Sequence, residues 1–168
     1  IIVPNNYADF LHWIPGNEEI LIYEENENKA QNITKNADLI FIMDLNHISR
    51  VGDFQESLSK ANSIKILIDH HQDPDTSIAN IIFSDTKVSS TAQLVYEIIN
   101  LMGLNNYIDQ TVAECLYVGI MTDTGSFKYS STNAKTHHII SKLIEKGVEN
   151  AKIHDLIYDN SSENRMRL

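Results

Sequence analysis

Short apolar runs alternate with longer polar segments along the first half of this chain, and this alternation restricts its fold more than any other feature. Four runs are rich in Ile, Leu and Phe, as expected of strands that are buried on both faces: 19–23, 39–43, 64–68 and 80–83. Residues 1–3 are a candidate fifth strand. The segments between the runs, including 28–36 and 53–62, are too long for hairpin turns, which favours helical crossovers between parallel neighbours.

The second half of the chain has helical spacing instead. Apolar positions fall on one helical face over 90–102, and Gly103 is placed to end that helix. Further helices are predicted over 109–122, with Asp109 as the N-cap, over 133–146, ended by Gly147, and over 150–159, with a continuation past that point. The sequence therefore predicts an α/β fold in which a mostly parallel sheet with helices on both faces is followed by a helical segment. A chain of 168 residues suits a single domain.

Charge and composition exclude several classes of protein. A formal net charge of -10 opposes nonspecific binding along long nucleic acid, which requires clustered Lys and Arg, although bound cations can supply positive charge for a small phosphate substrate. No apolar run is long enough to span a membrane. Cys115 is the single cysteine and is expected in the core of a cytoplasmic protein.

Acidic and imidazole side chains follow two of the predicted strands. Asp44 comes after 39–43, and Asp69-His70-His71 comes after 64–68. In open parallel sheets, ligands bind beyond the carboxyl ends of the strands, so these groups can share a metal ion at one sheet edge. Asp44 alone can equally be the cap of a following helix. Two consecutive histidines cannot both point into a core, and the preceding Asp69 can orient an imidazole.

A third acidic position lies in 121–127, where Asp123 ends an apolar helix. The helix dipole disfavours a negative charge there, which indicates a nearby cation, although an exposed turn residue is the alternative. His47 lies three residues after Asp44 and is a candidate substrate contact. Arg50 can bind phosphate or pair with Asp53.

Several of these elements together resemble the DHH phosphoesterase superfamily. They are Asp44 with the downstream Arg50-Val51-Gly52, Asp69-His70-His71, the helix start Ser89-Ser90-Thr91-Ala92, and the segment 119–125. The likeness extends over almost the whole chain and is greatest to the bacterial nanoRNase and pAp phosphatase branch, which is related to exopolyphosphatase.

The resemblance implies a site for two metal ions, usually Mn2+, that hydrolyses phosphate esters or anhydrides. By matching position, Asp44 would bridge both ions, His70 and Asp123 would hold the second ion, His71 would contact the scissile phosphate, and Asp69 would orient the histidine pair. Carboxylates and imidazoles without thiolate suit Mn2+ or Mg2+ better than structural zinc. Ser89 and Ser90 are given no catalytic role.

One family motif has no counterpart here. The family's first motif, a His followed by two spaced aspartates, supplies the remaining ligands of the first metal ion. We therefore expect that residues 1–168 are a single DHH-type domain truncated at its N-terminus by about one strand and one helix, on the order of thirty residues. The family's C-terminal substrate-binding domain is also expected to be absent, so this chain alone should be inactive.

The expected substrates are short oligoribonucleotides or 3'-phosphoadenosine 5'-phosphate (pAp). Pyrophosphate, polyphosphate and cyclic dinucleotides require the same metal chemistry and remain alternatives. A nonenzymatic nucleotide-binding regulatory module is the alternative from another class. The resemblance also suggests a homodimer.

Overall fold

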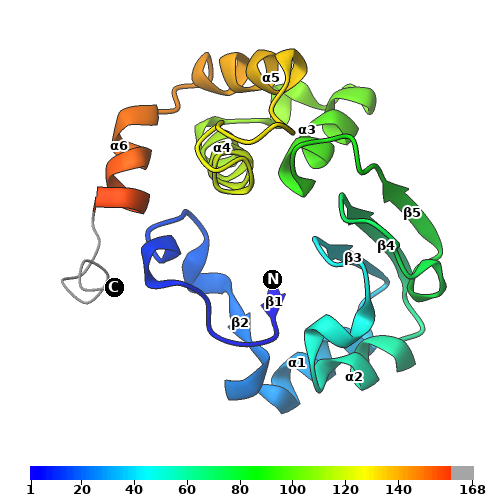
Figure 1. The fold of residues 1–168 in the computed structure, drawn as a ribbon. Coiled ribbons are helices and arrows are strands. Elements are labelled where there is room, and N and C mark those ends of the chain that lie inside the picture. The colour runs from blue at the N-terminus through cyan, green and yellow to red at the C-terminus, as the bar shows by residue number, and fades with distance from the viewer. Residues whose placement is uncertain (160–168) are drawn as a thin grey trace.

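The computed structural model describes residues 1–159 and has five short strands, all parallel to their neighbours (Figure 1). Strands β1 (Ile2–Val3) and β2 (Leu21–Ile22) form one sheet. Strands β3 (Leu39–Met43), β4 (Ile64–Asp69) and β5 (Ile81–Ser84) form a second sheet in the order β3-β4-β5. The fold class predicted from the alternating pattern is confirmed, and its strands are divided between two sheets.

Six α-helices accompany the strands in chain order. Helices α1 (Glu27–Asn36) and α2 (Phe54–Lys60) occupy the two predicted crossovers. The helical second half contains α3 (Thr91–Leu101), α4 (Gln110–Asp123), α5 (Ala134–Ile144) and α6 (Asn150–His154), which continues as a π-helical turn over Asp155–Asp159. Asp109 caps α4 as predicted, because its side chain accepts a hydrogen bond from the Val112 amide. The predicted continuation beyond residue 159 lies outside the described residues.

Helices cover both faces of the three-stranded sheet. On one face, Ile42 and Leu67 are buried in a cluster with Phe54 and Leu58 of α2 and Ala30 of α1. On the other face, α3 packs over the middle strand β4. The remainder of the second half forms its own core, because α4 packs against both α3 and α5. This arrangement places the start of α3 and the end of α4 near the three-stranded sheet.

Helix α3 leaves part of its face of the sheet uncovered. Leu39, Phe41 and Met43 of β3 are 44–54% exposed although they are large and apolar. They line a groove of about 830 Å3 that is bounded by β1, β3 and α3. Figure 1 shows β1 and β3 on opposite sides of this region. Within residues 1–159 no strand pairs with the outer edge of β3, and the two sheets therefore do not join.

No helix among the described residues combines the length and the apolar character that crossing a membrane requires. Short 3-10 turns connect several elements, and two of them border the site described next: Ile48–Val51 after β3 and Thr76–Ile78 after β4.

Candidate metal centre at the carboxyl ends of β3 and β4

The register of the sheet aligns the first two groups of the candidate site. Met43 pairs with Ile68, so Asp44 and Asp69 follow at the same level of neighbouring strands. The Asp44 amide donates to the Ile68 carbonyl at 3.1 Å, which continues the pairing by one residue. Asp44 then takes a left-handed backbone conformation with φ of 61°, which is uncommon for a residue with a Cβ and turns the chain out of the strand.

The structure brings together the metal ligands predicted from the sequence. Asp44, His70 and His71 each offer one ligand atom, and these atoms lie within 4.8 Å of one another. The Nε2 atom of His70 lies 3.7 Å from Asp44 Oδ1 and 3.5 Å from Asp123 Oδ2. Both distances exceed a hydrogen bond and approach the separation of about 3 Å between neighbouring ligands of one ion. This donor set fits a hard or borderline divalent cation.

Asp69 orients His71 and is itself fully buried. One carboxylate oxygen lies 2.6 Å from His71 Nδ1, and the other accepts the His71 backbone amide at 3.2 Å. Because a carboxylate accepts, the proton of the ring lies on Nδ1 and leaves Nε2 for the cluster. Of the two histidines, Asp69 bonds to His71, and its orienting role for the pair remains a prediction.

Asp123 reaches the cluster from the last residue of α4. A tight turn follows, in which the buried hydroxyl of Thr124 donates to the Ile120 carbonyl and accepts the Phe127 amide. Gly125 has φ of 56°, and a Cβ there would lie 2.6 Å from the ring of Tyr129. Both features favour glycine at this position of the turn that follows α4.

The pKa of Asp123 reflects its burial and the charged groups around it. Burial raises the pKa of the Asp123 carboxyl above its usual value, and the negative charge of Asp44 raises this pKa further. His70 and His71 act in the opposite direction, but their effects are smaller. A bound cation would offset the repulsion between the two carboxylates.

The two predicted substrate contacts lie outside this cluster. His47 begins the Ile48–Val51 turn, where its Nδ1 accepts the Ser49 amide at 3.2 Å, and its Nε2 faces Asp75 Oδ2 at 3.9 Å. Arg50 is exposed in the same turn, and within residues 1–159 no ion pair joins it to Asp53. Both substrate contacts remain predictions.

One neighbour of the cluster was not predicted from the sequence. The hydroxyl of Thr91, the first residue of α3, donates to Asp44 Oδ1 at 2.7 Å. Its only signal in the sequence is its place in the Ser89-Ser90-Thr91 helix start, and hydroxyl residues are common there as caps.

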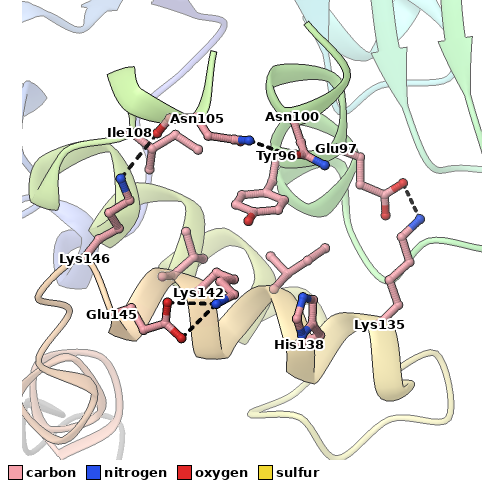
Figure 2. Close-up of a pocket in the computed structure, with 12 residues that line it drawn as sticks. Tyr96, Glu97, Asn100, Asn105, Ile108, Lys135, His138, Lys142, Glu145 and Lys146 are labelled. Carbon is pink, nitrogen blue, oxygen red and sulfur yellow. Dashed lines mark hydrogen bonds and ion pairs between the residues drawn. The ribbon is translucent and has the colours of Figure 1, made fainter. Parts of the chain in front are cut away.

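A pocket of about 390 Å3 that carries several charged side chains lies between α3 and α5 (Figure 2). Its lysines are already bonded: Lys135 to Glu97 at 2.6 Å, Lys142 to Glu145 at 2.9 Å, and Lys146 to the Asn105 carbonyl at 3.3 Å. None of the predicted site residues lines it. The Asp44 cluster is therefore the better candidate for phosphate chemistry.

Fold and site together define a parallel α/β protein with a candidate centre of carboxylates and imidazoles for divalent metal. Residues 2–120 match the family described as "DHH family, N-terminal domain". The chain belongs to this family, as its motifs indicated.

Three known proteins illustrate the range of similarity. An exopolyphosphatase-related protein from Bacteroides fragilis superimposes with a TM-score of 0.96 at 38% identity, over 99% of this chain and 48% of that protein. The bifunctional oligoribonuclease and PAP phosphatase NrnA of Bacillus subtilis is 28% identical over 79% of this chain and 41% of its own length. The cyclic-di-AMP phosphodiesterase GdpP of the same species is 29% identical over 89% of this chain and 23% of its own length. This chain thus spans less than half of each of the three.

Proposed function

We propose that this chain is the metal-binding part of a phosphoesterase that hydrolyses short oligoribonucleotides or pAp. The observation that carries the proposal is that Asp44 and Asp123, which are distant in sequence, both place a carboxylate oxygen within 3.7 Å of His70 Nε2. The similarity to the oligoribonuclease and PAP phosphatase NrnA supports the choice of substrate.

In the proposed mechanism, Asp44, His70 and Asp123 would hold divalent cations, with Mn2+ preferred and Mg2+ as the alternative. Bound ions of this kind lower the pKa of a water ligand and stabilise the attacking and leaving oxygens. His71 would present Nε2 to the phosphate, with its ring oriented by the bond between Nδ1 and the Asp69 carboxylate. His71 can therefore neutralise charge on the phosphate oxygens or donate a proton to the leaving oxygen.

We further propose that the centre is completed by polypeptide outside these 168 residues. Two observations support this: the chain spans less than half of the three relatives, and the apolar groove beside β3 has a free strand edge on which a further strand could pair. A strand in that groove would end at the same edge of the sheet as Asp44. The 168-residue chain alone is then expected to show no turnover, as predicted from its lack of the family's first motif.

The test is Mn2+-dependent hydrolysis of short RNA, pAp, pyrophosphate and cyclic dinucleotides by the whole protein and by this chain. We expect turnover of short RNA and pAp by the whole protein, and losses of about 10²-fold or more in Asp44→Asn and His70→Ala. Robust turnover by the 168-residue chain would contradict the proposal of an incomplete centre. A preference for cyclic dinucleotides would favour the second candidate function, which the similarity to the phosphodiesterase GdpP supports.

A further inference from the structure

A hydrogen bond joins the start of α3 to the carboxylate that follows β3. The Thr91 hydroxyl donates to Asp44 Oδ1 at 2.7 Å across 47 positions of sequence. Thr91 is only 6% exposed, whereas the Asp44 side chain is 54% exposed. A donor that is fixed by packing thus contacts a carboxylate that solvent would otherwise leave free to rotate.

The two serines before Thr91 already serve α3 itself. Ser90 is the N-cap, because its Oγ accepts the Gln93 amide at 3.0 Å. The Ser89 hydroxyl donates to the Gln93 side chain at 2.6 Å. The Thr91 hydroxyl is therefore not needed to cap the helix, and of the three it is the one bonded to a residue outside the second half of the chain.

The bond acts on the same oxygen that faces His70. Asp44 Oδ1 lies 3.7 Å from His70 Nε2, and the hydrogen bond from Thr91 occupies one acceptor position of that oxygen. The remaining positions on the carboxylate are left for a cation between Asp44 and the imidazoles. Carboxylates that ligate metals are commonly held by such hydrogen bonds, and loss of the partner typically weakens metal affinity about 10–100-fold.

We propose that Thr91 is a positioning residue that holds the Asp44 carboxylate in its metal-binding orientation. The proposal rests on the proposed function, since it takes Asp44 to be a metal ligand. The methyl group of Thr91 contributes packing, and the hydroxyl supplies the orientation.

The experiment compares the 168-residue chain with Thr91→Val, which removes the hydroxyl and keeps the shape, and with Thr91→Ser, which keeps the hydroxyl. Thr91→Ala is a second variant without the hydroxyl, in case the valine variant does not fold. Thr34→Val is the matched control, because Thr34 is also buried and its hydroxyl bonds only to the Ala30 carbonyl within α1. The first measurement is the rotamer distribution of Asp44 from three-bond NMR couplings without metal. The second is Mn2+ affinity, from the paramagnetic resonance signal of the free ion.

We expect one dominant Asp44 rotamer in the wild type, Thr91→Ser and Thr34→Val, and rotamer averaging in Thr91→Val and Thr91→Ala. Mn2+ affinity should fall about 10–100-fold in the two variants that lack the hydroxyl and stay near the wild-type value in the other two. The proposal would be overturned if Thr91→Val or Thr91→Ala folded and kept one Asp44 rotamer and the wild-type affinity for Mn2+. It would also be overturned if Thr91→Ser bound Mn2+ as weakly as Thr91→Val. If the whole protein also binds no Mn2+ while Thr91→Val still frees the Asp44 side chain, the proposed function fails and the positioning of Asp44 stands.

Discussion

Asp123 carries the largest electrostatic cost among the candidate ligands. Burial and the Asp44 charge raise the pKa of its carboxyl, so the folded chain without metal binds a proton at this position more tightly than the unfolded chain does. The charged carboxylate therefore destabilises the fold as pH rises from the unfolded pKa, about 3.9, through the raised folded pKa, and the full cost is present at neutral pH.

Asp123→Asn is consequently expected to raise the melting temperature of the metal-free chain at pH 7. The difference from the wild type should shrink as pH falls toward about 4, where the aspartate is protonated in both states. Mn2+ at about one hundred times its dissociation constant should stabilise the wild type by about 2.7 kcal/mol and the variant much less. Thermal unfolding with and without Mn2+ measures both effects, and a variant that is less stable than the wild type without metal would contradict the prediction.

The hydrogen bond between Asp69 and His71 leads to a second prediction about individual residues. Asp69→Asn in the whole protein removes the carboxylate that orients the His71 ring, so kcat for pAp should fall roughly 10²–10⁴-fold with a smaller change in KM. Asp85→Asn is a control, because Asp85 is exposed and accepts only a local hydrogen bond from the Lys87 amide. Equal losses in both variants would show that the effect is not specific to His71.

The sequence predicted which ligands meet, because parallel strands bring their carboxyl ends to one edge whatever their spacing along the chain. Asp44 and His70 came together on that basis, whereas Asp123 lies at the end of helix α4 and was singled out by its charge at a helix C-terminus and by the family resemblance. Thr91 could not be predicted, since its role depends on which side of α3 faces the end of β3, and a hydroxyl at a helix start is ordinarily a cap.

Helices α3 and α4 approach each other closely where Gly119 faces Ala92. A Cβ at position 119 would lie 2.7 Å from the Ala92 Cβ, which cannot move without its helix. This contact places the end of α4, with Asp123, beside the start of α3, with Thr91. Packing between these helices thus supports the geometry of the site.

Gly119→Ala should lower the free energy of unfolding by on the order of 1 kcal/mol, because the overpacking penalty outweighs the gain in helix propensity. Ala92→Gly in the same chain should recover part of the loss, giving a favourable coupling energy of about 0.5 kcal/mol or more in a double-mutant cycle. Urea unfolding measures both. Additive effects of the two substitutions would mean that these residues do not limit the approach of the helices.

Most predicted bounds of helices and strands agree with the structure to within one or two residues, and the strand predicted over 39–43 has the bounds of β3. The start of α4 follows its Asp109 cap, because the cap and the apolar stripe are both local in sequence. The predicted strand over 19–23 is only Leu21–Ile22 in the structure, and it pairs with the two residues of β1. A strand extends only as far as the strand that pairs with it. The identity and length of that partner cannot be predicted from the residues of the strand itself.

At the scale of the molecule, the uncovered apolar face is the most unusual feature. Leu39, Phe41 and Met43 line the 830 Å3 groove, and exposed apolar surface of this kind promotes association. The net charge of -10 opposes association at long range, but salt screens that repulsion. We expect the isolated chain to self-associate more as ionic strength rises.

Phe41→Lys should reduce this association and change the free energy of unfolding by less than about 0.5 kcal/mol, because the Phe41 side chain is 54% exposed. Light scattering after size-exclusion chromatography, at low and high salt, measures the effect. Gln55→Lys, a change at an exposed position of α2 away from the groove, adds the same single positive charge and tests whether altered net charge alone explains the outcome. Unchanged association of Phe41→Lys would exclude the groove as the contact.

The free edge of β3 also determines how its backbone exchanges hydrogen with water. The Asp44 amide bonds to Ile68, and the Ile64 amide bonds to Asp38, so the even-numbered residues of this stretch turn their backbone groups toward β4. The backbone N–H and C=O groups of Phe41 and Met43 then point away from β4, where no strand within residues 1–159 forms hydrogen bonds with them. Deuterium uptake should alternate along one strand, fast at Phe41 and Met43 and slow at Ile40 and Ile42, and a longer polypeptide that fills the groove should abolish the alternation.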